Sequence, residues 1–422
     1  MITLIIVAIV LVPPVALYAG GSREPAPEDA RATESTPFPA ERELEQMRRL
    51  ATIGAELRTD GGVFRDVSLP PDLQNQDPPP GAHQFRTDFS RALIPYSEIV
   101  AGGPPKDGIP AINDPRFVGV AEMERLLRDQ EALIAVTVAG ETHLYPLQIL
   151  MWHEIVNDEV GGRPVSVTYC PLCNTGVVFD RTFDGEVFDF GVSGRLIYSN
   201  MLMYDRQTET WWIQATGRGV VGEYAGQQLR LVPSTMISWA QAREAYPDAR
   251  VLSFETGYRR DYGRNPYRGY DSADAPFLYR GPAVVDSGGE DPMMRVLSVY
   301  HGEAVTAVSF PELEASRVVQ RELDGAAVVV FWAAGTASAL DDSWVSGGRD
   351  VGTANAFYPR VEGRELTFRV EDGEITDRET GSRWNAAGIA REGELAGTRL
   401  EPALSVHHFL FSWRAFHPEG GL

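Results

Sequence analysis

The stretch EIVNDEVGGRPVSVTYCPLCNTG, residues 154–176, recurs without its sulfurs as RVVQRELDGAAVVVFWAAGTASA, residues 317–339. The two stretches align without a gap, and a second pair, YDRQTETWW and TDRETGSRW, follows in the same order. Aligned pairs in the first run include Val156 and Val319, Gly162 and Gly325, Val165 and Val328, and Tyr169 and Trp332. Several matches in one order predict two copies of one unit, which is a duplicated pair rather than a solenoid.

Strands dominate the predicted unit. Short valine-rich runs are separated by Gly, Asp and Asn, which is typical of strands joined by hairpin turns. Helices are the minority, and the best candidates are residues 121–129, 147–158 and 238–248. The sequence therefore predicts an α+β, β-rich fold in which a β-rich domain occurs twice in tandem.

Composition limits the possible functions. The chain has 422 residues, enough for two packed cores, with 59 acidic and 38 basic residues and a net charge of -21. A phosphate backbone would be repelled by this charge, because the basic residues form no separate run. Nucleic acid is therefore excluded as a partner.

Four segments follow from the composition along the chain. Residues 1–20 are apolar and predict a signal peptide or an N-terminal anchor. Residues 21–81 predict a linker rich in Pro and acidic residues with one helix, residues 82–285 the first repeat, and residues 286–422 the second, degenerate repeat. We expect an extracytoplasmic location: periplasmic, secreted, or tethered to the membrane by the first segment if it is not cleaved.

The comparison of the repeats also separates residues needed for folding from residues that only one repeat has. His153, Glu154, Asn157, Asp158, Cys170 and Cys173 face Ser316, Arg317, Gln320, Arg321, Ala333 and Thr336. The second repeat therefore lacks the whole polar set, including the only two cysteines of the chain. A single functional site in the first repeat explains why these residues are missing together.

The spacing of the polar set favours a metal site. On the predicted helix 147–158, His153 and Asn157 share one face, and Glu154 and Asp158 share the adjoining face. A strand before Cys170 then brings both sulfurs toward that helix. We expect Cys170, Cys173 and His153 to bind one metal ion, Zn or Cu, and a metalloenzyme is one form of this hypothesis.

The remaining polar residues have supporting roles in this hypothesis. Glu154, Asn157 and Asp158 would surround the ligands, and Glu154 or Asp158 would be the candidate catalytic groups for moving a proton.

Two alternatives to the metal site remain open. Cys-Pro-Leu-Cys also suits a thiol-disulfide oxidoreductase that uses Cys170 and Cys173 directly. In the third hypothesis the pair is a structural disulfide in a non-catalytic binding module. The sequence does not decide whether the protein is an enzyme.

A segment between the repeats, residues 256–271, is dense in Tyr, Arg and Gly. Such side chains suit the recognition of an anionic or planar group on a small molecule or protein, and they equally suit a brace between the two repeats. The candidate ligand-binding residues are Tyr258, Arg259, Tyr262, Arg264 and Tyr267.

Two other pairs are assigned to structure. Met201 and Met203 alternate as strand residues do, which favours core packing over copper ligation. His407 and His408 lie beside the apolar run FLFSW, which favours a core or surface role over metal binding.

Three segments resemble a known family. HEIVNDEVGGRPVSVTYCPLCNTGVVFDR, FGVSGRLIYSNMLMYDRQTETWW and TGYRRDYGRNPYRGYD are similar to the signature segments of DUF3179, a domain-of-unknown-function family of bacterial and archaeal proteins. The resemblance begins at about Phe85. Asn174 stands where typical members have a glycine, and Leu144 departs from the family's AYP at Leu144–Pro146; neither change removes a candidate ligand. The resemblance implies export, and it implies no established activity.

Overall fold

The structure is a computed structural model that describes residues 60–64, 67–281, 289–418 and 421–422. All of them belong to one compact unit that runs from Glu41 to Leu422. The predicted signal peptide or anchor and the predicted helix of the linker lie outside the described residues. Within the described part, no helix is both long enough and apolar enough to cross a membrane.

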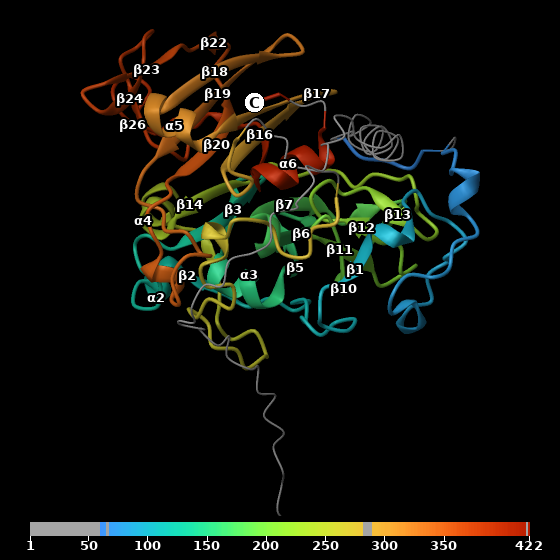
Figure 1. Ribbon diagram of the computed structural model, residues 1–422. Coiled ribbons are helices and arrows are strands. Elements are labelled where there is room, and N and C mark those ends of the chain that lie inside the picture. The colour runs from blue at the N-terminus through green and yellow to red at the C-terminus, as the bar shows by residue number, and fades with distance from the viewer. Residues whose placement is uncertain (1–59, 65–66, 282–288, 419–420) are drawn as a thin grey trace, which may run out of the picture. The chain divides into compact units, whose positions relative to one another are not determined.

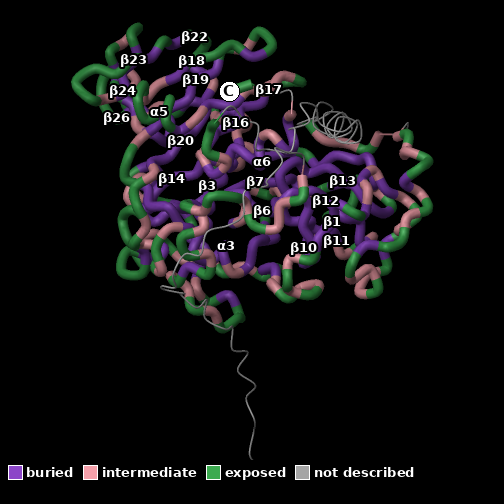
Figure 2. The backbone as a smooth tube through the Cα atoms, viewed as in Figure 1, coloured by how far each residue is buried: buried purple, intermediate pink, exposed green. Residues whose placement is uncertain are grey.

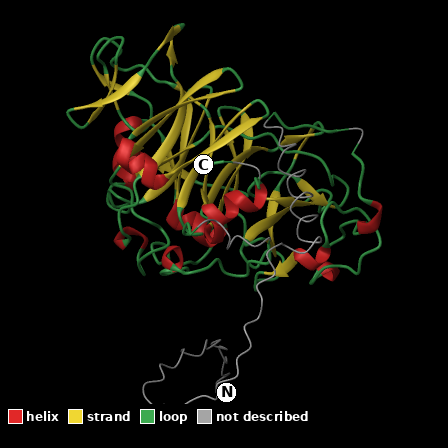
Figure 3. Ribbon diagram, turned by 45° about the horizontal axis from the view of Figure 1, so that its top comes forward, coloured by secondary structure: helices red, strands yellow, loops and turns green. Residues whose placement is uncertain are grey.

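The first repeat contains three main sheets (Figure 1), and strands far outnumber helices (Figure 3), which confirms the predicted β-rich fold. Five strands order as β14-β3-β4-β15-β2, three as β5-β6-β7, and five as β1-β10-β11-β12-β13. The strands are β1 (Ile99–Ala101), β2 (Phe117–Gly119), β3 (Ala132–Val138), β4 (Glu141–Pro146), β5 (Ile155–Val160), β6 (Arg163–Cys170), β7 (Thr175–Asp180), β8 (Thr182–Phe183), β9 (Glu186–Val187), β10 (Phe190–Ile197), β11 (Asn200–Asp205), β12 (Trp211–Ile213), β13 (Gly219–Val221), β14 (Thr235–Ser238) and β15 (Arg250–Leu252). The helices are α2 (Val120–Met123), α3 (Leu147–His153) and α4 (Trp239–Ala245).

The second repeat has the sheets β17-β16-β28, β18-β19-β20-β27 and β23-β24-β25-β26. Its strands are β16 (Arg295–His301), β17 (Ala304–Ser309), β18 (Val318–Leu323), β19 (Ala326–Ala333), β20 (Thr353–Tyr358), β21 (Arg360–Val361), β22 (Arg364–Glu365), β23 (Phe368–Glu371), β24 (Glu374–Asp377), β25 (Arg383–Trp384), β26 (Ala390–Glu392), β27 (Glu401–Pro402) and β28 (Leu404–Phe409). Its helices are α5 (Phe310–Ser316) and α6 (Leu410–Phe416). Short 3-10 helices are η1 (Pro71–Leu73), η2 (Ala82–Gln84), η3 (Tyr96–Glu98), η4 (Pro171–Cys173), η5 (Tyr270–Ser272) and η7 (Val345–Gly347).

The order of elements in the first repeat recurs in the second. A hairpin, a helix and a second hairpin appear as β3, β4, α3, β5 and β6, and again as β16, β17, α5, β18 and β19. The first hairpin gains an antiparallel third strand, β14 or β28, which leads directly into a helix, α4 or α6. This recurrence agrees with the alignment of the sequence, and the duplication itself stays a prediction.

The predicted helix 147–158 is wrong in its second half. The helix α3 ends at His153, because Glu154 takes a left-handed conformation with φ 58°. β5 begins at Ile155 and pairs antiparallel with β6, from Ile155 opposite Thr168 to Val160 opposite Arg163. Asn157 and Asp158 therefore lie on a strand and point to opposite faces, so the helical spacing used to join them to His153 does not exist.

The core of the first repeat surrounds β5, β6 and β7. Nearly all of the residues of β6 and β7 are buried (Figure 2), because side chains from α3, β3 and β11 cover both faces of this sheet. β7 also packs beside β28 of the second repeat, and β14 packs beside β20. The second repeat therefore packs directly against the sheet β5-β6-β7, which leads into the turn with the cysteines.

Part of the segment assigned to the linker packs against the first repeat. Leu73 is 5% exposed and belongs to a cluster with β10 to β13. The side chain of Gln74 donates to the carbonyl of Ala92 at 3.1 Å, and that of Gln76 donates to Ile94 at 3.2 Å. Residues 67–81 thus extend the surface of the folded body.

Candidate functional site

The two cysteines flank a tight turn at the end of β6. Cys170 is its last residue, Pro171 begins η4 with its fixed φ, and Asn174 closes the turn in a left-handed conformation before β7 starts. The Tyr169 hydroxyl donates to the Asn174 side chain at 3.0 Å and holds the turn in place. Both cysteines are free thiols, with exposed fractions of only 2% for Cys170 and 0% for Cys173.

Hydrogen-bond donors gather around the sulfur of Cys173. The Asn200 side chain donates to it at 2.9 Å from the start of β11. Burial alone would raise the pKa of the Cys173 thiol, but the bond from Asn200 and the nearby polar groups of Cys170, Thr175 and Ser412 outweigh burial and lower the pKa below its usual value. These groups therefore stabilise the thiolate form of Cys173.

Cys170 has the opposite tendency. Its thiol donates to the carbonyl of Ser199 at 3.7 Å. Burial raises the pKa of Cys170 well above its usual value, and the neighbouring Cys173 and Glu154 raise it further, while the amide of Met201 opposes them. The pair is therefore asymmetric, with a proton held on Cys170 and negative charge favoured on Cys173.

Glu154 lies close enough to this pair for its carboxyl to interact electrostatically with both thiols. It follows the last residue of α3, where its backbone turns the chain from the helix into β5. Burial raises the pKa of its carboxyl to about 8, the charge of Cys173 adds to this effect, and a 3.4 Å hydrogen bond from Tyr267 opposes it. A carboxyl with this pKa can both hold and accept a proton near neutral pH.

His153 is buried but occupied by other partners. Its Nδ1 lies 2.7 Å from the carbonyl of Pro110, and its Nε2 lies 2.6 Å from the hydroxyl of Tyr262. Burial lowers the pKa of the imidazole to about 4, so the ring is neutral near pH 7. Both ring nitrogens face groups other than the thiols.

The structure does not gather the predicted ligands into a cluster. Throughout residues 60–64, 67–281, 289–418 and 421–422, no group of three or more His, Cys, Asp or Glu side chains is placed to hold a metal ion. The predicted ligand set of Cys170, Cys173 and His153 therefore gains no support from the geometry.

Asn157 and Asp158 serve the packing of β5. The Asn157 amide donates to Asn113 at 2.7 Å and to the carbonyl of Phe190 at 2.8 Å, which ties β5 to β10. Asp158 lies on the other face, 2.7 Å from Nδ1 of His143, and accepts a hydrogen bond from Tyr145 at 2.5 Å. Their contacts thus involve neighbours other than the two sulfurs.

The segment 256–271 divides between two tasks. Tyr262 and Tyr267 reach His153 and Glu154, whereas Tyr258 packs its ring against His153 at 5.3 Å and remains 42% exposed. Arg264 stacks over the ring of Trp344 at 3.9 Å, so it braces the second repeat. Arg259 lies on the surface.

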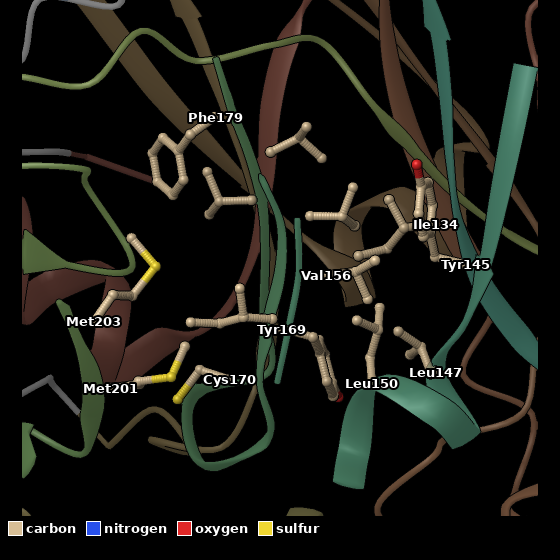
Figure 4. Close-up of a cluster of buried hydrophobic side chains, with 14 of the residues drawn as sticks. Ile134, Tyr145, Leu147, Leu150, Val156, Tyr169, Cys170, Phe179, Met201 and Met203 are labelled. Carbon is tan, nitrogen blue, oxygen red and sulfur yellow. The ribbon is translucent and has the colours of Figure 1, made fainter. Parts of the chain in front are cut away.

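A cavity of about 640 Å³ opens beside the thiol turn. Leu172, which separates the two cysteines, forms part of its wall, together with Glu154, Met201, Tyr267 and Tyr270. Phe277 and the guanidinium of Arg195 complete a mostly apolar lining. Figure 4 shows Cys170 and Met201 among the buried side chains of the core. A small molecule in the cavity would meet the carboxyl of Glu154 and the backbone turn that carries the sulfurs.

Three residues of the site were missed from the sequence: Asn200, Thr175 and Ser412. One signal could have found the first of them. In the register that aligns Asp205 with Asp377, Asn200 aligns with Asp372 of the second repeat. Like the cysteines, Asn200 is therefore replaced by another residue type in the second repeat. Ser412 lies on α6 of the second repeat, and no local pattern links it to Cys173.

Comparisons with known proteins agree with the resemblance noted in the sequence. The model of a family described as "Protein of unknown function (DUF3179)" matches residues 106–420. No curated protein and no solved structure matches the chain. The matched range contains the thiol turn, Glu154, the Tyr/Arg segment and nearly all of the second repeat. Because it covers most of the 422 residues, the chain belongs to the DUF3179 family.

Proposed function

We propose that Cys170 and Cys173 are a redox-active dithiol that cycles between two thiols and one disulfide. The observation that carries this proposal is the set of donors around one sulfur, with Asn200 at 2.9 Å from Cys173. The thiolate is the nucleophile in thiol-disulfide exchange, and donors to sulfur favour that form. Cys170, three residues away in the same turn, is the thiol that completes the exchange.

The reaction balances with a small disulfide as the oxidant. The Cys173 thiolate attacks one sulfur of this disulfide, and its other sulfur leaves as a thiolate that takes up a proton. The Cys170 thiol gives its proton to Glu154 and attacks the Cys173 sulfur. The second thiol of the oxidant leaves, and Glu154 returns the proton to it. Two protein thiols and one disulfide become one protein disulfide and two thiols.

The cavity supports a small reaction partner. Both sulfurs are almost fully buried, so a protein surface cannot reach them directly. The cavity of about 640 Å³ lies against Leu172, between the two cysteines, and its wall includes Glu154. A small compound with only a few atoms on each side of its disulfide bond fits this space. Rotation of the Leu172 side chain would give that compound access to the two sulfurs.

A redox titration tests the proposal. Purified protein is equilibrated in thiol-disulfide buffers of graded potential, and its free thiols are counted by mass after alkylation. We expect a reversible two-electron transition at a potential above about -300 mV, the range of exchangeable rather than structural disulfides. The dithiol function would be overturned by a disulfide whose reduction potential lies below about -300 mV. It would equally be overturned by thiols that form no disulfide in oxidising buffer.

A matched pair of asparagine variants tests the role of Asn200. Asn200→Leu should raise the pKa of Cys173, because it removes the 2.9 Å donor. The control is Asn355→Leu, which removes a buried asparagine that bonds to Met236 and Ala386 instead of sulfur. The pH dependence of alkylation in a Cys170→Ser background measures this pKa. An equal effect of both variants would show that Asn200 acts through general packing.

A second candidate function, copper binding, is favoured by Met201. Its amide donates to Cys170, and its thioether lies toward Cys170 in the same core (Figure 4). Two thiolates and a thioether are soft ligands that suit Cu(I), whereas zinc would require further nitrogen or oxygen ligands. Metal analysis decides between the candidates: stoichiometric copper in the wild type, reduced in Met201→Leu, would favour this function over the dithiol.

A further inference from the structure

Arg195 places a positive charge in the wall of the cavity beside the thiol turn. The residue is only 5% exposed, and it lines this cavity together with Glu154 and Leu172. Its Nε donates to the carbonyl of Pro80, and its Nη1 donates to the carbonyl of Gly194 at 2.9 Å. Nη2 has no acceptor among the residues that the structure describes, so it is available to a ligand.

The charge of Arg195 is not balanced by a carboxylate. Burial lowers its pKa, yet a guanidinium keeps its proton at neutral pH, and no acidic side chain in the described part of the chain forms an ion pair with it. By contrast, the guanidinium of Arg295, with 12% of its side chain exposed, lies 2.9 Å from the carboxylate of Asp271. Because an uncompensated buried charge is costly, an anionic group in the cavity would be bound favourably at Arg195.

Two glycines fix the position of this guanidinium. Strand β10 bulges between Val192 and Arg195, which turns the arginine relative to the rest of the strand. Within the bulge Gly194 has φ 71°, and a Cβ there would lie 2.2 Å from the carbonyl oxygen of Pro104. Gly81 lies against the guanidinium so closely that a Cβ would lie 1.6 Å from Nη2. The backbone around Arg195 is therefore shaped to its side chain.

The hairpin that carries Arg195 is extended only in the repeat with the thiols. β10 and β11 have eight and six residues, whereas β23 and β24 of the second repeat have four each. Both hairpins begin with a phenylalanine opposite an aspartate. The added part of the longer hairpin contains Arg195 and Met201, and both line the cavity with Leu172, which separates the two cysteines. The charge thus reaches the thiol turn through an extension that the second repeat lacks.

The rest of the lining determines which anions fit the cavity. Leu196, Met201 and Phe277 supply apolar surface, and the carboxyl of Glu154 is mostly neutral near pH 7 because burial raises its pKa to about 8. Arg268 also lines the cavity, but this residue is exposed. One buried cation in a mostly apolar wall suits a molecule with one carboxylate and an apolar body. A phosphate dianion would lose more hydration than one guanidinium restores.

We propose that the cavity binds small molecules with a carboxylate and an apolar body, and that Arg195 recognises the carboxylate. The substrate class follows from this site and rests on the dithiol function: the oxidant is a small disulfide that carries a carboxylate. Its carboxylate lies on Arg195, and its sulfurs face Leu172. Arg195 positions the disulfide and takes no part in the exchange, which still converts two protein thiols and one disulfide into one protein disulfide and two thiols.

Calorimetry with probes that cannot react with thiols tests the carboxylate site by itself. The reduced full chain is titrated near pH 7 with hexanoate, with hexanol, which has the same carbon chain without the charge, and with inorganic phosphate. We expect hexanoate to bind about tenfold more tightly than hexanol, as one hydrogen bond to a charged group provides, and more tightly than phosphate. Equal binding of hexanoate and hexanol, tighter binding of phosphate, or no binding of hexanoate overturns the site.

Variants of two arginines in the same cavity test the role of Arg195. Arg195→Met removes the charge and should abolish the preference for hexanoate over hexanol, and Arg195→Lys should recover part of it. Arg268→Met is the matched control, and it should change the affinity for hexanoate by less than about twofold, because an exposed charge is screened by water. A preference that survives in Arg195→Met, or that falls equally in Arg268→Met, contradicts recognition by Arg195.

A second variant keeps the test valid if Arg195→Met does not fold. Gly81→Ala retains the charge but places a methyl group where Nη2 now lies, so it should displace the guanidinium. We expect it to lower the affinity for hexanoate and to leave the affinity for hexanol nearly unchanged. An equal loss for both probes would mean that Gly81→Ala alters the cavity as a whole, and it would count against the site.

Disulfide probes connect the site to the dithiol function. Oxidation of the reduced protein by dithiodipropionate, which carries carboxylates, is compared with oxidation by hydroxyethyl disulfide, which is neutral. We expect the ratio of the two rates to fall by about tenfold in Arg195→Met, the same factor as for one charge-assisted hydrogen bond.

The outcomes separate the inference from the function on which it rests. If hexanoate binds as expected but neither disulfide oxidises the cysteines, the dithiol function fails and the carboxylate site stands. If both disulfides oxidise the cysteines and the ratio of their rates is the same in the wild type and in Arg195→Met, the dithiol function stands and the proposed substrate class is wrong.

Discussion

At the scale of single residues, the site is made by side chains on a backbone that both repeats share. Glu154 and Arg317 occupy the same place after a helix, with φ values of 58° and 60°. Their amides bond to the fourth residue before them, at 2.6 Å in both cases. Strain at this turn is therefore a property of the fold. Only the side chain differs: the carboxyl of Glu154 lines the cavity, and Arg317 donates to Gly373 at the surface.

The buried carboxyl of Glu154 predicts a pH dependence of stability. Its pKa is about 8 in the folded protein against 4.5 ordinarily, so the folded state keeps a proton that the unfolded state loses. The stabilisation is complete below about pH 4.5 and is lost as the pH rises through about 8. The free energy of unfolding should fall by about 1.4 kcal/mol per pH unit within that window. Glu154→Gln should remove this slope in urea denaturation.

Glu131 provides the control for this prediction. Burial raises its pKa to about 7, so it contributes a similar slope that ends about one pH unit lower. Between pH 7 and pH 8, Glu154→Gln should make the free energy of unfolding nearly independent of pH. Glu131→Gln should leave most of the slope in that interval unchanged. Identical slopes in the wild type and Glu154→Gln over this interval would mean that the carboxyl is solvated.

At the scale of elements, one turn shows how both repeats are closed. At the end of β11, Asp205 accepts hydrogen bonds from the amide of Thr208 at 2.6 Å and from the indole of Trp212 at 2.9 Å. At the end of β24, Asp377 accepts hydrogen bonds from the amide of Thr380 at 2.6 Å and from the indole of Trp384 at 2.9 Å. One carboxylate thus fastens a turn to the next strand in each repeat.

Loss of either carboxylate should therefore cost about the same. Asp205→Ala and Asp377→Ala should each lower the free energy of unfolding by about 2–4 kcal/mol, because each leaves a buried indole N–H and a turn without their charged acceptor. Chemical denaturation measures this cost. Asp377→Ala should leave the alkylation rate of the cysteines unchanged, and a large change there would mean that the second turn also shapes the thiol site.

At the scale of the whole molecule, the Tyr/Arg segment is fixed to the second repeat through Asp271. Its buried carboxylate lies 2.9 Å from Arg295 and 3.0 Å from Arg349, and it accepts a hydrogen bond from Ser338. The preceding Tyr270 donates to the carbonyl of Leu172 at 2.8 Å, in the middle of the thiol turn. The second repeat therefore holds the segment that covers the cysteines.

Asp271→Asn should loosen this cover. Arg295 loses its buried counter-charge, so the free energy of unfolding should fall by about 2–4 kcal/mol. The segment should open more often, and alkylation of the cysteines in native conditions should become several-fold faster. Asp341→Asn is the matched control, because it removes a more exposed partner of Arg349 at 3.1 Å. Equal thiol reactivity in the two variants would contradict a covering role for the segment.

The sequence by itself determined much of this protein. Valine alternation around 154–176 and 317–339 predicted the strands, and the polar residues present in one repeat only located the thiols and Glu154. It failed at residues 154–158, where the apolar spacing of a helix continued past His153. Pairing of this segment with β6 overrides that local pattern. The hydrogen bonds between β5 and β6 and the burial of Ile155 and Val156 are gained only in the assembled sheet.

Only the tertiary structure decided what surrounds the sulfurs. Asn200 and Ser412 come from a hairpin and a helix that lie far from Cys173 in the sequence. Tertiary packing likewise places the two ring nitrogens of His153 against the Pro110 carbonyl and the Tyr262 hydroxyl. A hydrogen bond needs its partners within about 3 Å, and no local pattern can set that distance between remote segments. The packing of β7 against β28 sets it here.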